Sequence, residues 1–215
     1  MLHLFCHVKH ETDRAALRAA VTEAVAEGIQ VIPVAVQGHK ADIAFMIIGP
    51  DWWRIRHLQS ELRVAGLTIS DSYVSLTEVS EYAQSRPDEY KQAKLYPQLP
   101  PEGLTNWCFY GMSRTRDVGA NWYALDFDER RKLMGEHGGT GRAYRGRVLQ
   151  LITGSSGIDD YEWGVTLFAR HPDDLKEIVY EMRYDRASAI YGIFGPFITG
   201  TIGTLDEVLD AVGVG

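Results

Sequence analysis

The spacing of apolar positions predicts alternating strands and helices in the first part of the chain. Four segments are rich in apolar and β-branched residues and predict strands: 2–8, 29–36, 41–48 and 67–79. Two segments between them carry apolar residues at helical spacing: 12–27 and 51–64. The resulting order is βαββαβ, which is the order of a ferredoxin-like unit. Gly28 is expected to end the first helix, and Pro33 predicts an edge position or a bulge.

The same order recurs in the second part. Strands are predicted at 106–112, 148–153, 161–168 and 194–202, and helices at 126–137, ended by Gly138-Gly139, and from 173 onward. Residues 83–104 hold four prolines and predict a linker with at most short structure. We therefore expect an N-terminal half at 1–82, a linker at 83–104 and a C-terminal half at 105–215. Two such antiparallel α+β halves would pack sheet on sheet or close into a barrel.

The charge and hydropathy of the chain indicate which kinds of partner it lacks. The chain has 22 basic and 29 acidic residues, a formal charge of −7, which argues against nucleic acid. No apolar stretch reaches about 18 residues, and the first residues lack a basic region before an apolar run. We expect a cytoplasmic protein with no membrane partner. Cys6 and Cys108 lie in apolar runs and predict buried, reduced thiols.

His137 is a candidate metal ligand. It ends a predicted helix, where a histidine is also favoured by the helix macrodipole, and that structural explanation is the commoner one for a single histidine. No second ligand stands at metal spacing. A lone histidine suits haem iron, whose other ligands come from the porphyrin, better than a bare ion.

Basic and phenolic residues form a second candidate set: Tyr82, Lys94, Tyr110, Arg114 and Arg116. Each one singly is explained by surface charge or core packing. Together they would form a cationic, hydrogen-bonding rim in an acidic protein, which suits a ligand with several carboxylates.

The stretch 108–200 resembles the coproheme decarboxylase branch of the chlorite dismutase superfamily. The similarity lies in the segments 108–114, 121–125, 129–134, 137–138, 141–142 with Tyr144, 150–155, 159–168 and 180–185, and more loosely in 38–43 and 80–82. The resemblance implies a dimeric α+β barrel of two ferredoxin-like halves, with the porphyrin in the C-terminal half. It also implies a homopentamer.

The resemblance further implies an activity and the residues that perform it. The activity is peroxide-dependent decarboxylation of two propionates of Fe-coproporphyrin III (coproheme) to vinyl groups, giving haem b through a tyrosyl radical. By position, His137 is the proximal iron ligand and Tyr110 the redox-active tyrosine. The remaining residues contact the porphyrin: Tyr82, Lys94, Arg114 and Ser188 at propionates, Met112 at the ring edge, and Gln150 at the distal side of the iron.

Gln150 discriminates between activities. Chlorite dismutases resemble one another in having a distal arginine, so a glutamine argues against chlorite as the substrate. A haem-binding peroxidase, sensor or carrier without decarboxylase activity is the main alternative. A barrel that binds no porphyrin is another.

Three positions depart from the family pattern. Gly111 stands where proline is usual, Arg114 where lysine is usual, and Lys94 where arginine is usual. Gly111 would loosen the strand end that carries Tyr110. The arginine and lysine exchanges would change the geometry of propionate binding, because only arginine offers a planar fork of donors.

Overall fold

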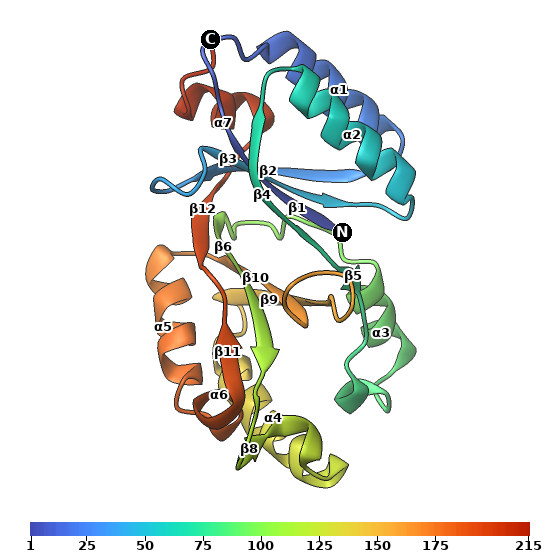
Figure 1. The fold of residues 1–215 in the computed structure, drawn as a ribbon, viewed down its shortest axis with the longest axis vertical. Helices are drawn as coiled ribbons and strands as arrows, with labels where there is room; N and C mark the ends of the chain where they lie inside the picture. Colours follow the sequence, from blue (N-terminus) through green and yellow to red (C-terminus); the bar gives the residue numbers. More distant parts are fainter. The chain divides into compact units, whose positions relative to one another are not determined.

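Figure 1 shows the fold in a computed structural model that describes residues 1–215. The chain forms two compact units, one of Met1–Ser75 with Ile198–Gly215 and one of Leu76–Phe197. The last 18 residues therefore contact the first unit, although the sequence pattern placed them in a C-terminal half at 105–215. None of the helices combines the length and hydropathy that a membrane span needs.

The first unit is ferredoxin-like, as predicted. Its elements are β1 (Leu2–His7), α1 (Arg14–Ala26), β2 (Gln30–Val36), β3 (Ile43–Ile48), α2 (Trp52–Val64), β4 (Thr68–Val74), β12 (Ile198–Ile202) and α7 (Leu205–Ala211). The strands pair antiparallel in the order β4-β1-β3-β2-β12. Pro33 does not mark an edge strand, because β2 lies between β3 and β12. Pairing with β12 begins one residue later, at Val34, so the missing N–H of Pro33 costs no bond there.

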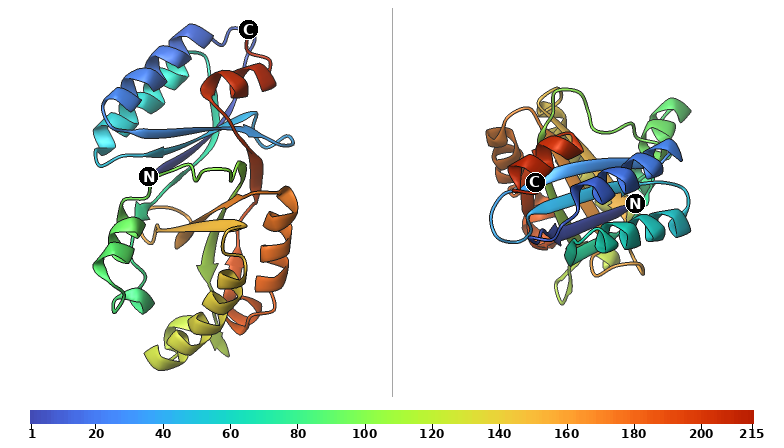
Figure 2. Two further views of the ribbon diagram at one scale, coloured as in Figure 1. Left: turned by 180° about the vertical axis from the view of Figure 1, so that it is seen from behind. Right: turned by 90° about the horizontal axis from the view of Figure 1, so that it is seen from above.

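Alternate residues of β1 and β3 form the core of this unit. Leu2, Leu4 and Cys6 face the helices, as strand alternation requires, and pack with Leu17 of α1 and Leu58 of α2. Figure 1 and Figure 2 show α1 and α2 side by side over the sheet.

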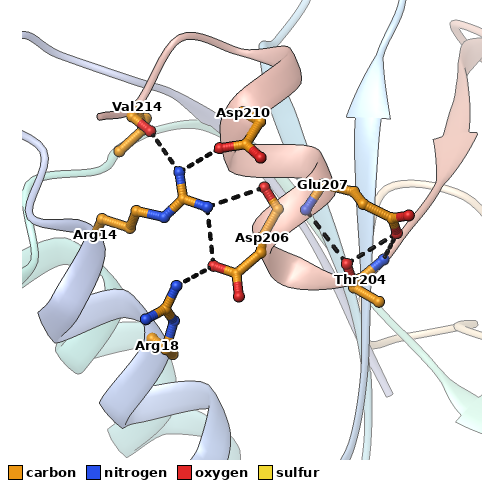
Figure 3. A network of polar contacts seen from close by, with 7 residues as sticks. All are labelled: Arg14, Arg18, Thr204, Asp206, Glu207, Asp210 and Val214. Atoms are coloured by element: carbon orange, nitrogen blue, oxygen red, sulfur yellow. Dashed lines mark hydrogen bonds and ion pairs between the residues drawn. The ribbon is translucent and has the colours of Figure 1, made fainter.

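Polar contacts fix the ends of these helices. The Asp13 side chain accepts a hydrogen bond from the Ala16 N–H at 3.0 Å, and that of Asp51 accepts one from the Trp53 N–H at 2.8 Å. Helix α7 contacts α1 through Arg14 and Arg18 (Figure 3).

The second unit contains every residue predicted for the functional site. Its elements are β5 (Leu76–Thr77), η1 (Glu81–Ala83), α3 (Asp88–Leu95), β6 (Asn106–Arg114), β7 (Arg116–Asp117), β8 (Ala120–Asn121), η2 (Trp122–Ala124), α4 (Phe127–Ala143), β9 (Val148–Gly154), β10 (Trp163–Ala169), α5 (Pro172–Met182), α6 (Arg186–Tyr191) and β11 (Gly192–Phe194). The antiparallel order β11-β6-β10-β9-β5 again gives the ferredoxin-like arrangement. The predicted linker 83–104 holds one short helix, α3.

Two predicted elements of this part were wrong in extent. The strand expected at 194–202 is two strands: β11 pairs with β6, whereas β12 pairs with β2 of the first unit. The helix expected to end at Gly138-Gly139 continues as α4 to Ala143. Contacts with α5 and α6 outweigh the low helix propensity of the glycines.

Candidate functional site

Strand alternation places the predicted site residues of the sheet on one face. Tyr110, Met112 and Arg114 are alternate residues of β6, and Tyr110 packs in the cluster that includes Leu175 and Ile178 of α5. Gln150 of β9 lies opposite Leu167 of β10, which belongs to the same cluster. These side chains therefore face the helical side of the sheet.

His137 lies on α4 and is held by a carboxylate. Its Nδ1 is 3.1 Å from Asp185 Oδ2, and both side chains are mostly buried. An ionised carboxylate only accepts hydrogen bonds, so Nδ1 carries the proton and Nε2 keeps its lone pair. Burial lowers the pKa of His137, the charge of Arg114 lowers it further, and Asp185 opposes the shift. A neutral imidazole with a free Nε2 is the form that ligates iron.

Glycines in the last turns of α4 leave the helix surface beside His137 without side chains. Gly141 lies one turn beyond His137, on the same face of the helix. A Cβ at Gly141 would lie 3.2 Å from Gln150 Nε2 and 3.1 Å from Met182 Cε. The side chain of Gln150 therefore reaches the helix face that carries His137.

Arg114 is a buried cation without a carboxylate partner. Its side chain donates to the Ala187 carbonyl and to Met134 Sδ, the latter at 3.5 Å. Its guanidinium carbon lies 4.7 Å from the ring centre of Trp122. The residue is 4% exposed, and burial lowers its pKa. A buried charge usually has a counter-ion, so this guanidinium favours an anionic ligand.

Tyr110 is enclosed by aromatic rings. Its ring stacks on Phe197 with centroids 4.4 Å apart and lies tilted against Phe194 at 6.0 Å. Burial raises the pKa of Tyr110, so the phenol is neutral at physiological pH. Met112, two residues further along β6, packs at the border of the same cluster.

Tyr82 is held by α4. Its hydroxyl accepts a hydrogen bond from Arg130 Nε at 3.3 Å, and its ring stacks on Phe127 at 5.7 Å. Burial and Glu81 raise the pKa of Tyr82 to about 12, although Arg130 opposes them. Tyr82 packs against the cluster that contains Ala187, the residue whose carbonyl accepts from Arg114.

Lys94 and Gln150 form a second contact of the site. Lys94 Nζ on α3 donates to the Gln150 carbonyl at 3.5 Å, and burial lowers the pKa of the amine. Lys94 makes no ion pair. Ser188 is buried on α6, one residue after Ala187. The structure thus brings Arg114 and Tyr82 to the segment around Ala187, where Ser188 follows in the chain, and joins Lys94 to Gln150.

Sequence reasoning missed the residues that support the site. Asp185 holds His137, Trp122 stacks on Arg114, and Arg130 bonds Tyr82. Asp185 lies in the segment 180–185 that carries the family resemblance, but it was assigned no role from the sequence. No sequence spacing relates it to His137, 48 residues earlier.

Comparisons of the sequence with known proteins identify its relatives. The sequence model of the family described as chlorite dismutase matches residues 11–203. The chain is 44% identical over 177 residues to the coproheme decarboxylase of Staphylococcus carnosus (strain TM300), covering 78% of this chain and 70% of that protein.

Solved structures share the fold. A haem-binding protein from Thermus thermophilus is 34% identical, with a TM-score of 0.87 over 99% of this chain and 94% of that one. A mutant chlorite dismutase from Candidatus Nitrospira defluvii is 19% identical, with a TM-score of 0.76 over 98% of this chain and 94% of the other. At that identity the second likeness concerns the fold alone, which confirms the predicted class.

Proposed function

This chain belongs to the chlorite dismutase family, and we propose that it is a coproheme decarboxylase that converts coproheme to haem b with hydrogen peroxide as the oxidant. The observation that carries the proposal is the buried Arg114 guanidinium, which has no carboxylate partner and whose charge acts on His137. An anchor for an anionic group thus contacts the helix that carries His137, because Arg114 reaches Met134, one turn before His137 on α4. Coproheme offers both an iron atom and four carboxylates.

The residues present fit an iron porphyrin. His137 Nε2 would hold the iron, and Asp185 would fix the orientation of the imidazole. Arg114 and Lys94 would bind propionates, with Tyr82 and Ser188 as hydrogen-bond donors. The bound iron porphyrin supplies the redox chemistry with peroxide. Gln150, which reaches the His137 face of α4, stands where chlorite dismutases carry an arginine, and this disfavours chlorite as the substrate.

Tyr110 is the proposed catalytic residue. Once oxidised by one electron with loss of its phenolic proton, it takes a hydrogen atom from the β-carbon of a propionate held by Arg114. Loss of a second electron and of carbon dioxide leaves a vinyl group. For each propionate, one peroxide and one proton are consumed and two waters are formed. Arg114 contributes by positioning, because it follows Tyr110 by four residues on the same strand face.

The test is a peroxide titration of the protein loaded with ferric coproheme, followed by mass spectrometry. Two successive losses of a carboxyl group with its hydrogen, ending at haem b, would support the proposal. Tyr110→Phe should retain coproheme binding and lose carbon dioxide release, whereas retained turnover would contradict the radical role.

A haem-binding function without decarboxylation is the second candidate. It is favoured by the likeness to the haem-binding protein from Thermus thermophilus. Tight porphyrin binding with bleaching by peroxide and no loss of mass would support this candidate instead.

We further propose that the protein is a homopentamer. Exposed apolar side chains, such as Trp52 and Trp53 at the start of α2, are compatible with subunit contacts. Light scattering should then give a mass about five times the 24.1 kDa of the chain.

A further inference from the structure

Glu162 is bonded to three successive residues at the end of β6. It precedes β10, whose first residue, Trp163, pairs with Met112. The Glu162 N–H donates to the Met112 carbonyl and to Ser113 Oγ, both at 3.1 Å. Its carboxylate Oε2 accepts the Arg114 N–H at 2.9 Å. One residue therefore fixes the backbone from which Met112 and Arg114 extend.

The charge of Glu162 is compensated by a residue other than Arg114. Glu162 Oε1 accepts from Arg116 at 2.5 Å, and Oε2 accepts from the Tyr123 hydroxyl. The Arg116 guanidinium also lies 4.3 Å from the ring centre of Tyr123. The Glu162 side chain is 12% exposed, so these bonds operate in a partly dry environment where they are stronger than in water.

Because Glu162 bonds the Arg114 main chain and the Arg116 side chain, the Arg114 guanidinium remains available for an anionic ligand. Glu162 bonds the main-chain N–H of Arg114, whereas the Arg114 side chain forms no ion pair. If Glu162 paired with the guanidinium, the site would lose its positive charge. The Glu162 carboxylate instead accepts from Arg116 and from the Tyr123 hydroxyl.

We propose that Glu162 is a positioning residue for the substrate carboxylate and that it acts through Arg114. Glu162 fixes the backbone from which Arg114 enters the site, and Arg116 with Tyr123 keeps the carboxylate away from the guanidinium. This role rests on the proposed function, because it assumes that Arg114 binds a propionate of the porphyrin.

The test measures the affinity for ferric coproheme by absorbance titration. Glu162→Ala should bind it about tenfold more weakly, the change expected when a hydrogen bond to a charged group is lost. Glu162→Gln retains an oxygen for the Arg114 N–H and should stay within about threefold of the unchanged protein. Glu78→Gln is the matched control, because Glu78 bonds the Trp163 side chain at 3.1 Å and none of residues 112–114. It should bind as the unchanged protein does.

A double-mutant cycle separates positioning from general structural support. In an Arg114→Ala background, Glu162→Ala should weaken binding by less than about twofold, since the residue through which it acts is gone. A further tenfold loss in that background would overturn the proposal. So would unchanged affinity of Glu162→Ala alone.

A second variant covers the case in which Glu162→Ala does not fold. Arg116 is 62% exposed at its side chain, so Arg116→Met should fold. It frees the carboxylate to pair with Arg114, and coproheme affinity should fall about threefold or more. Unchanged affinity would contradict the role given to Arg116. If the unchanged protein itself bound no coproheme, the proposed function would fail, a result distinct from normal binding that is insensitive to both variants.

Discussion

Gly111 lies where the structure leaves no room for a side chain. A Cβ there would lie 2.4 Å from Tyr161 Cδ2, and the same ring covers Gly195, whose N–H donates to the Gly111 carbonyl at 2.8 Å. The Tyr161 ring is thus packed against Gly111 of β6 and against Gly195, which follows β11. Family resemblance indicates proline at this position, and the absence of a Cβ is explained here by the placement of Tyr161.

Gly111→Ala should lower the free energy of unfolding by about 1–3 kcal/mol, the cost of overpacking a site that cannot relax freely. Urea denaturation measures it. Gly135→Ala is the control, because nothing lies within 4 Å of a Cβ at Gly135 on the exposed face of α4. That change should stabilise the protein by up to about 1 kcal/mol, since alanine favours helix. Equal stability of Gly111→Ala and the unchanged protein would contradict the packing argument.

His3 makes stability depend on pH. It is 1% exposed on β1, and burial lowers its pKa to about 3. Below the ordinary histidine pKa, about 6.5, the unfolded chain binds a proton that folded His3 excludes. The free energy of unfolding should therefore fall as pH drops from about 6.5 towards 3, by up to about 1.4 kcal/mol per pH unit.

Urea unfolding at a series of pH values, compared with His3→Gln, checks this. The variant should show a shallower slope, although not a flat one, because the lowered pKa of His137 acts with the same sign. His57→Gln, at an exposed position on α2, should keep the original slope. If the free energy of unfolding of His3→Gln changed with pH as it does in the unchanged protein, the pH dependence would not come from His3.

At the scale of elements, α4 depends on one carboxylate. Its last turns contain Gly138, Gly139 and Gly141, each costing about 1 kcal/mol relative to alanine. Asp185 offsets this cost by accepting from Thr140 Oγ1 at 2.8 Å and pairing with His137. The segment that bears the proposed iron ligand is therefore held from outside the helix.

Asp185→Ala should speed amide hydrogen exchange of residues 137–143 by about tenfold or more, because bonds to a charged group are worth about 1.5–3 kcal/mol. Exchange elsewhere in the chain should change little. Asp160→Ala, at an exposed loop position, is the control. Unchanged exchange in the last turns of α4 would show that other contacts hold them.

These elements also show where sequence patterns stop being informative. The spacing of apolar residues and the turn residues predicted both βαββαβ units. Each strand buries one face and each helix buries one stripe, and this shows in the residues of the element itself. Gly138-Gly139 predicted a helix end, yet α4 continues because it packs against α5 and α6 and because Asp185 bonds its last turns. The division of the apolar run 194–202 is marked locally by Gly195-Pro196, but the partners of its two strands are not: β11 pairs with β6 and β12 pairs with β2. The site shares this limit: His137 and Arg114 were proposed from the sequence, whereas Asp185 and Glu162 act through contacts 48 residues away.

At the scale of the whole molecule, the two ends of the chain meet in the first unit. Strand β12 extends the sheet beside β2, and α7 adds Val208 and Leu209 to the core under α1 and α2. The sequence pattern assigned these residues to the second half because they follow it without a linker. Only the pairing of β12 with β2 reveals that the chain returns.

Two arginines of α1 bond the C-terminal segment that contains α7, as Figure 3 shows. Arg14 contacts Asp206 at 3.0 Å, Asp210 at 2.5 Å and the Val214 carbonyl at 3.0 Å, while Arg18 shares Asp206 at 2.5 Å. Both arginines lower the pKa of Asp206. A carboxylate with a lowered pKa stabilises the fold above its ordinary pKa and loses that contribution as pH falls through the lowered value.

Arg14→Ala should therefore lower the thermal midpoint of unfolding at neutral pH and should increase proteolysis within residues 205–215, because the C-terminal segment loses its contacts with Arg14. The difference from the unchanged protein should shrink in strong acid, where Asp206 is protonated and no longer pairs with Arg14, and at high salt, where exposed pairs are screened. Arg63→Ala, at an exposed position of α2 without an ion pair, serves as the control and should leave both readouts unchanged. If Arg14→Ala gave the same thermal midpoint and proteolysis as that control, the apolar contacts of Val208 and Leu209 would be sufficient to hold α7. The ion pairs would then not be needed to keep the C-terminal segment in the first unit.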